Sequence, residues 1–328
     1  MTSPPLEIRS RTLASEAAQL WRRHQWLCVW FVCVVAWISI IGIPGSRPQI
    51  FAIVGMGLIA SCSGTSTAWK RVALDWAPLY FMLTLYDVLR GSVAHWLSPH
   101  SLQQIAIDQW LFGGTIPTVR LQHAFYTPGV AHPWDYAAFI VYMSHFFLAF
   151  IVAAWLWKFS YHRFRRFAIL LVTLTFAAFA TYVIYPAMPP WLASRQAVLQ
   201  PTAKIIDEMW THIGIANGAH ILSATGHFAN PVAAVPSLHA AYPMLLLLFF
   251  WSSAPRWRWL LVTYVLAMGL TLVYTGEHYV IDILLGWLYA TVVYVLGSRA
   301  LDRWGIGTGT PAPLAVSARA PASVSTSD

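Results

Sequence analysis

Long apolar stretches separated by short polar segments run through most of the chain. A helix that crosses a bilayer needs about 20 mostly apolar residues, and about eight stretches approach this length. A bilayer leaves no water for unpaired backbone groups, so helices are expected, and the alternating pattern of barrel strands is missing. We therefore predict an all-α polytopic membrane bundle with six to eight spans. The stretches are residues 25–44, 48–69 (the weakest), 72–90, 136–157, 167–186, 238–254, 258–275 and 279–298.

Composition agrees with this pattern. The 328 residues are 58% hydrophobic and only 10% charged, whereas soluble domains carry about 25% charged residues. This deficit excludes an ordinary water-soluble enzyme, a disordered protein and a disulfide scaffold. Cys28, Cys33 and Cys62 lie in apolar runs without zinc-ligand spacing, so we expect neither disulfides nor a metal. We also expect no cofactor.

The distribution of Lys and Arg predicts the orientation. Cytoplasmic loops carry an excess of these residues, and the best alternation of spans puts fifteen of the 20 on one side. That side would be cytoplasmic and would hold both termini, so the net charge of +8 reflects topology and not nucleic-acid binding. We expect a cell-membrane protein. The other five cations would be extracytoplasmic: Arg47, Arg90, Arg120, Arg195 and Lys204.

Three parts of the chain are predicted. Residues 1–24 form a cytoplasmic segment, 25–298 the membrane domain, and 299–328 a cytoplasmic tail whose Gly, Thr, Pro, Ala and Ser composition predicts disorder. Two long loops fall on the outer side. The loop 91–135 contains an amphipathic stretch, SLQQIAIDQWLFGG, suited to the membrane interface. The loop 187–236 is rich in Pro, Gly and His.

One outer histidine stands at the predicted start of a helix. In PSLHAAYPMLLLLFF, Ser237 is a plausible N-cap, which puts His239 in the first helical turn. Unpaired amides and the positive end of the helix dipole favour an anion such as phosphate there. A histidine lying at the membrane interface explains the position equally well, and both interpretations stay open on this motif alone.

A second outer histidine lies four residues before an aspartate, in YTGEHYVID. This spacing predicts that His278 and Asp282 share one helix face, where the carboxylate can orient the imidazole as in a nucleophile–base relay. Alternatively, the aspartate caps the helix or pairs with an arginine. Two antiparallel helices joined by a short inner turn separate the two motifs, so His239 and His278 can meet at the outer membrane face.

These motifs resemble a known family. PSLH followed by HYVID is similar to the second and third signatures of the type-2 phosphatidic acid phosphatase superfamily, and YPAMPPW, PSLHAA and YTGEHYVID resemble its inositol phosphorylceramide synthase and sphingomyelin synthase branch in a bacterial form. The motif core covers residues 136–298. The resemblance implies a helical membrane bundle with its site at one membrane face. It also implies that His278 is a nucleophile forming a phosphohistidine, that Asp282 is its partner, and that His239 is the general acid and base.

The chain departs from the phosphatases of that family at two places. Thr271 and Leu272 stand where those phosphatases carry Ser-Arg, and YPAMPPW replaces their first signature. The synthase branch shares both departures, so the resemblance favours transfer over hydrolysis. The departures leave open which cations bind the phosphate.

A phosphoryl transfer needs positive charge around the phosphate oxygens. Arg90, three residues after Asp87, is the first candidate, followed by Arg195 and Lys204; each is alternatively a contact at the rim or with headgroups. Ser237 and His145 are further candidates for contact with substrate. His145 lies within a predicted span, where a hydrogen bond to a neighbouring helix is the simpler explanation.

The sequence thus predicts a membrane phosphotransferase that moves a headgroup phosphate, similar to inositol phosphate, from a lipid to an alcohol acceptor. The main alternative is a lipid phosphate or polyprenyl diphosphate phosphatase that uses the same site with water as the acceptor. A transporter or scramblase built on the same bundle is a second alternative. A glycosyltransferase is disfavoured because the loop between the first two spans has no acidic residue.

Overall fold

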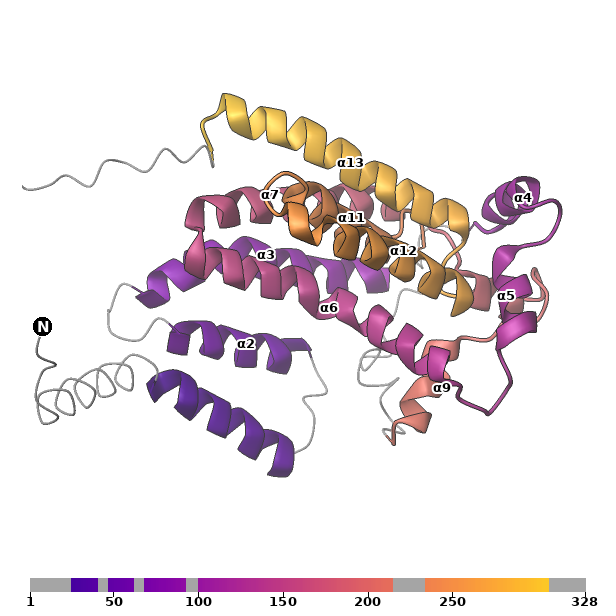
Figure 1. Ribbon diagram of the computed structural model, residues 1–328, viewed down its shortest axis with the longest axis horizontal. Helices are drawn as coiled ribbons and strands as arrows, with labels where there is room; N and C mark the ends of the chain where they lie inside the picture. Colours follow the sequence, from indigo (N-terminus) through magenta and orange to yellow (C-terminus); the bar gives the residue numbers. More distant parts are fainter. Residues whose placement is uncertain (1–24, 41–46, 62–67, 93–99, 215–233, 307–328) are drawn as a thin grey trace, which may run out of the picture.

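The computed structural model describes residues 25–40, 47–61, 68–92, 100–214 and 234–306. Within these ranges the fold is helical, as predicted, and it contains no strand beyond two isolated bridges, His100 with Ala187 and Thr127 with Val130. The long helices run lengthwise and side by side (Figure 1). Their bounds are Gln25–Ile40, α2 Arg47–Ser61, α3 Ala68–Ser92, α4 Leu102–Leu111, α5 Pro117–Phe125, α6 Pro133–Phe159, α7 Tyr161–Ile184, α8 Pro190–Arg195, α9 Ile205–His212, α11 Leu238–Phe250, α12 Arg258–Tyr274 (after a 3-10 turn, Pro255–Trp257) and α13 Val280–Arg303.

Each apolar stretch predicted to span the membrane overlaps one of these helices. Within the described residues, four helices are long and apolar enough to cross a bilayer: α6, α7, α12 with its preceding turn, and α13. The helix Gln25–Ile40 and α11 are apolar but shorter. Helix α2 has 15 residues, about 22 Å at 1.5 Å per residue, and the segment that follows it, 62–67, lies outside the described residues. The four long helices support membrane residence, and the total of eight spans stays a prediction.

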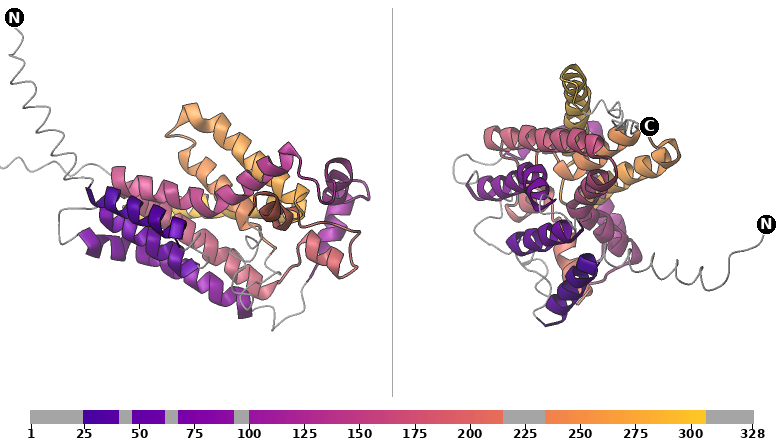
Figure 2. Two further views of the ribbon diagram at one scale, coloured as in Figure 1. Left: turned by 90° about the horizontal axis from the view of Figure 1, so that it is seen from below. Right: turned by 90° about the vertical axis from the view of Figure 1, so that its left-hand side faces the viewer.

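The core of the bundle lies between α6, α7, α11 and α13. Buried residues such as Leu156, Phe164, Leu174 and Leu245 fill it, because each of these helices turns an apolar face inward. Seen end-on in Figure 2 (right), α13 lies at one edge and the helix Gln25–Ile40 at the opposite edge. Many apolar side chains of the outer helices are exposed, as expected where lipid is the solvent.

Hydrogen bonds between side chains connect the helices inside this apolar core. Thr175 and Tyr242 join α7 to α11 with their oxygens 2.7 Å apart, and Thr181 and Tyr289 join α7 to α13 at the same distance. Each threonine hydroxyl also donates to the carbonyl four residues earlier in α7. Hydroxyl pairs of this kind link helices where no water competes, and they hold α11 and α13 against α7.

One end of the bundle is cationic. The α6–α7 turn meets the α11–α12 turn through a hydrogen bond from Arg163 to Ser253 of 2.7 Å, and Arg166 forms an ion pair with Asp302 at 2.5 Å. This ion pair and the burial of Leu301 explain why α13 continues past residue 298, the predicted end of the span. Residues 307–328 lie outside the described part of the chain. The opposite end carries α4, α5, α8 and α9 (Figure 1).

Candidate active site

The starts of α11 and α13 are joined at the end of the bundle opposite the cationic turns. The backbone N–H of Ser237 donates to the carbonyl of Asp282 at 3.0 Å. The Ser237 hydroxyl accepts from the Ala240 amide at 3.3 Å, so Ser237 caps α11 as predicted. The Tyr182 hydroxyl donates to the carbonyl of Pro236 at 2.8 Å. Helices α11 and α13, which carry or directly follow the residues predicted to be catalytic, therefore begin at one place.

Gly286 allows this close approach. A Cβ atom added at this position would lie 2.4 Å from the backbone oxygen of Ser237 and 3.5 Å from the Cβ of Ala240. The first distance is well inside van der Waals contact, and its partner is backbone rather than a mobile side chain. Only glycine fits between α13 and the start of α11.

Asp282 contacts His278 across the first turn of α13. The Oδ2 atom of Asp282 lies 3.4 Å from the Nδ1 atom of His278, and the two residues are 0% and 5% exposed. His278 precedes the helix, whose N-cap is Tyr279, so the two do not share a helix face as predicted. Instead the carboxylate reaches back and also accepts the Tyr279 amide at 3.0 Å. A proton on Nδ1 would face this carboxylate and would leave the lone pair on Nε2.

The two histidines of the separate motifs come together. The ring centroids of His239 and His278 are 5.6 Å apart. A nucleophile lies about 3–3.5 Å from its target atom before reaction, and a general acid about 2.6–3.2 Å from the oxygen that it protonates. Two rings at this separation can therefore serve opposite sides of one phosphorus atom.

Aromatic rings surround His239. The His145 ring lies 4.1 Å from it and the Tyr142 ring stacks on it at 4.9 Å, while His145 itself stacks on Tyr242 at 4.9 Å. The Nδ1 atom of His145 is buried and has no hydrogen-bond partner within the described residues. The structure thus places His145, a candidate for substrate contact, directly beside His239.

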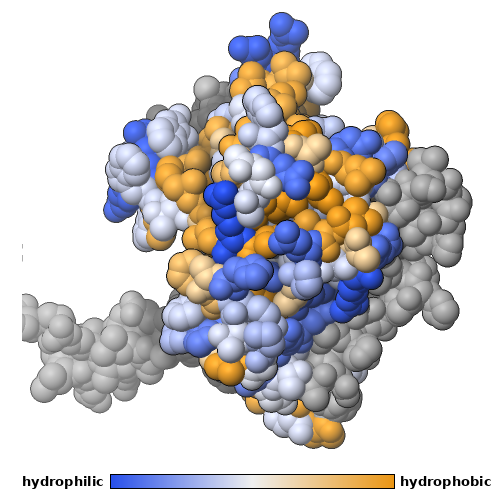
Figure 3. Space-filling view, turned by 90° about the vertical axis from the view of Figure 1, so that its right-hand side faces the viewer, coloured by the Kyte–Doolittle hydropathy of each residue, from blue (hydrophilic) through white to orange (hydrophobic). Residues whose placement is uncertain are grey.

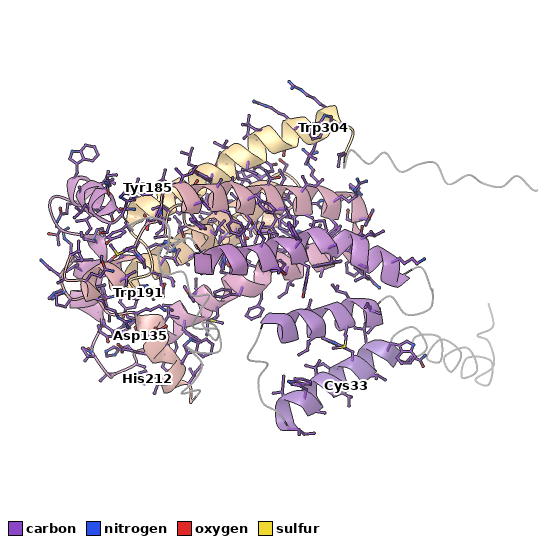
Figure 4. All side chains as sticks on the ribbon, turned by 180° about the vertical axis from the view of Figure 1, so that it is seen from behind. Cys33, Asp135, Tyr185, Trp191, His212 and Trp304 are labelled. Carbon is purple, nitrogen blue, oxygen red and sulfur yellow. The ribbon has the colours of Figure 1, made fainter. Side chains whose placement is uncertain are left out.

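Of the five predicted outer cations, Arg120 donates to the carbonyl of Phe112. Arg195 and Lys204 both contact the indole of Trp191, at 5.0 and 4.9 Å from the ring centroid, and Lys204 also forms an ion pair with Asp207. Figure 4 shows Trp191 at the end of the molecule opposite Trp304. The side chains of Arg90, the first candidate, and of Arg47 lie outside the described residues.

Three successive carbonyls before His278 are each held by a different outer segment. The backbone carbonyl oxygen of Tyr274 accepts a hydrogen bond from the Gln122 side chain at 2.9 Å. The carbonyls at 275 and 276 accept from the amides of Ile205 and Trp191 at 3.3 and 3.1 Å. The path from the end of α12 to His278 is therefore fixed by α5, α8 and α9 together.

The family comparison fits this arrangement. A family model described as the PAP2 superfamily matches residues 105–296, a range that contains His239, His278 and Asp282. The chain belongs to the PAP2 superfamily.

A curated relative of this PAP2 superfamily chain gives a more specific likeness. The phosphoinositol dihydroceramide synthase of Bacteroides thetaiotaomicron is 27% identical over 257 residues, which cover 74% of this chain and 81% of that protein. No solved structure matches the chain significantly. Family membership and the synthase relative make this chain an enzyme of the lipid phosphotransferase and phosphatase class, as the motifs predicted.

Two residues inside the PAP2 match were not singled out from the sequence. The Gln122 side chain bonds to both backbone groups of Ala203, and Asp108 accepts two amides at the start of α13. Burial raises the pKa of Asp108, although these two amides oppose the shift. Asp108 is the sole charged residue in SLQQIAIDQWLFGG. This isolated charge in an apolar stretch is the sequence feature that could have indicated a role for Asp108. Within the described ranges, no group of three or more His, Cys, Asp or Glu side chains is arranged so that it could hold a metal ion.

Proposed function

We propose that this enzyme transfers a headgroup phosphate, of the inositol phosphate kind, from a membrane phospholipid to an alcohol acceptor through a phosphohistidine on His278. The observation that carries this proposal is the approach of two imidazoles, 5.6 Å between centroids, with Asp282 behind one of them. A nucleophile, an orienting carboxylate and a second proton-carrying group are the parts that two-step covalent transfer needs.

In the first step His278 attacks the donor. The Nε2 lone pair forms a bond to phosphorus while the bond from phosphorus to the diacylglycerol oxygen breaks. Protonated His239 gives its proton to that oxygen, so diacylglycerol leaves as a neutral alcohol. The Asp282 carboxylate, 3.4 Å from Nδ1, stabilises the positive charge that develops on the imidazole of His278.

The second step returns the enzyme to its starting state. Neutral His239 accepts the proton of the acceptor hydroxyl while that oxygen attacks phosphorus, and the bond to Nε2 breaks. His239 ends protonated and His278 ends neutral, ready for another donor. His239 thus acts as a general acid in the first step and as a general base in the second, as a double displacement requires.

The residues around the site favour an alcohol over water as the acceptor. Thr271 and Leu272, where the phosphatases of the family carry Ser-Arg, are buried, and the Thr271 carbonyl accepts the Thr275 hydroxyl at 2.8 Å. A cation at position 272 would have to be buried there. The relative described above is named as a synthase of phosphoinositol dihydroceramide, which supports the same choice. Hydrolysis of a lipid phosphate is the alternative.

We further propose that the site faces the extracytoplasmic side and that both termini are cytoplasmic. The Arg-rich turns around Arg163 and Arg258 lie at the end of the bundle away from the site, where the positive-inside rule places the cytoplasm. Figure 3 looks onto the site end and shows apolar residues gathered toward its middle with polar residues around them. Such a surface suits a lipid whose headgroup lies at the membrane boundary.

The test of this proposal is a transfer assay. Purified enzyme in proteoliposomes receives phosphatidylinositol labelled in the inositol ring, with or without dihydroceramide. We expect labelled phosphoinositol dihydroceramide to appear only with the acceptor, and little free inositol phosphate in its absence. Release of inositol phosphate at the same rate with and without dihydroceramide would support the hydrolase alternative instead.

A second prediction concerns the cations at Trp191. If Arg195 and Lys204 bind the donor phosphate, the double variant R195A/K204A should raise KM for phosphatidylinositol by about tenfold. A hydrogen bond to a charged group contributes about 1.5–3 kcal/mol. The lower end of that range applies here because Arg195 is exposed to solvent. KM is measured in the same assay. The matched control is R120A, which loses only an exposed bond to the Phe112 carbonyl and should leave KM unchanged. Equal KM values for both variants would assign the pair to the structure of the outer segment.

A further inference from the structure

Asp108 makes an unusual contact with the start of α13. It is 0% exposed, and its carboxylate lies against the first turn of a helix that is more than 170 residues later in the sequence. Its Oδ2 atom accepts the Val280 amide at 2.9 Å and its Oδ1 atom accepts the Ile281 amide at 3.1 Å. Helix starts leave such amides without a partner inside the helix, and here a residue of α4 supplies the acceptors.

The sequence of α13 explains why an outside acceptor is needed. Its N-cap is Tyr279, which lacks the short side-chain oxygen of Ser, Thr, Asp or Asn that normally bonds the first amides. Asp282, the acidic residue of the first turn, is already turned toward the Tyr279 amide and the ring of His278. Without Asp108, the amides of Val280 and Ile281 would have no acceptor and would compete with Tyr279 and His278 for the Asp282 carboxylate.

Packing holds α4 in place for this contact. Ile105 of α4 and Ile116 and Val119 around α5 form an apolar cluster with the fully buried ring of Tyr279. The outward side of α4 is apolar and exposed at Leu102 and Trp110, in keeping with the predicted interfacial stretch. Helix α4 thus presents one face outward and its single carboxylate inward.

We infer that Asp108 is a positioning residue for the proposed transfer reaction: it caps α13 from outside and so leaves Asp282 free to orient His278. Asp108 does not touch the reacting atoms in this scheme, and it acts through the first turn of α13. The inference rests on the proposed function, because it assumes that His278 and Asp282 carry the chemistry.

The expected consequence is a loss of kcat with little change in KM. Displacing a nucleophile by about 1 Å costs about 10²-fold in rate, whereas donor binding does not involve the Asp108 carboxylate. We expect D108A to lower kcat by about that factor and to leave KM within about twofold. D108N, which keeps one oxygen acceptor for two amides, should lie between D108A and the natural enzyme.

A matched control separates positioning from stability. Asp75 in α3 likewise accepts two side-chain hydrogen bonds, from Trp157 at 2.8 Å and Tyr161 at 2.7 Å, but at the end of α6 away from the site. D75A should lower the melting temperature and keep kcat per folded molecule. All variants are assayed in proteoliposomes with labelled phosphatidylinositol and dihydroceramide, and folded protein is quantified by thermal unfolding.

The outcomes are distinct. A kcat that falls from the natural enzyme to D108N to D108A, with D75A unaffected, supports the inference. A kcat for D108A within about twofold of the natural enzyme, a change in KM alone, or an equal loss in D75A overturns it. If D108A does not fold, the comparison of D108N with D75A decides. An active H278Q variant in the same series would instead overturn the proposed function.

Discussion

Replacement of His278 by glutamine is expected to abolish transfer, lowering the rate by about 10⁴-fold or more, because the glutamine amide has no nucleophilic nitrogen with which to form the bond to phosphorus. Glutamine keeps similar size and polarity, so the burial of this position, 5% exposed, is little disturbed. The rate is measured with labelled phosphatidylinositol and dihydroceramide. Acid-labile mass corresponding to inositol phosphate, trapped on the natural enzyme by rapid quenching, should be missing from the variant.

The control for this experiment is H212Q. His212 is an exposed residue at the end of α9, on the same side of the bundle (Figure 4), and its loss should change neither the rate nor the adduct. A transporter or scramblase that needs no covalent step would keep its activity in H278Q. That result would remove the covalent mechanism altogether.

The second large effect is expected from Gly286→Ala. In an ordinary helix this change stabilises by about 1 kcal/mol, but here the new methyl group would lie 2.4 Å from the backbone oxygen of Ser237. Overpacking of this kind forces backbone shifts, and the shift would separate the starts of α11 and α13. We expect a loss in kcat of about 10²-fold, measured in the transfer assay.

Gly269→Ala is the matched control for Gly286→Ala. Gly269 lies in α12, and an added Cβ there would meet the Trp287 side chain at 3.4 Å, an ordinary contact. This variant should keep its activity and gain slightly in melting temperature. If both glycine variants behave alike, the contact between Gly286 and Ser237 is not what fixes the spacing of the histidines.

The helical fold follows from the sequence because the apolar stretches are long and the bilayer permits little else. The cap formed by Ser237 could be predicted for a similar reason, since it depends on residues within three positions of one another. The meeting of His239 and His278 required topology as well, namely two antiparallel helices between the motifs. These features are encoded locally or by the order of the spans.

Other contacts of the site could not be predicted from the sequence. Gln122 bonds to the carbonyl of Tyr274, and Asp108 bonds to Val280, across intervals in which no sequence pattern connects the partners. Gly286 looks like any glycine of a membrane helix until the backbone of Ser237 is placed beside it. The position of the Asp282 carboxylate, which reaches backward past the helix start, likewise depends on where the chain turns at His278.

The three carbonyls held before His278 have a consequence for how relatives of this enzyme can vary. Two of them bond to main-chain amides, at positions 191 and 205, so those bonds are compatible with any residue except proline, which lacks the N–H. The side chain at the partly exposed position 191 can therefore change without loss of the bond that holds the carbonyl at 276. Substitution in this outer segment is thereby separated from the backbone path that leads to His278.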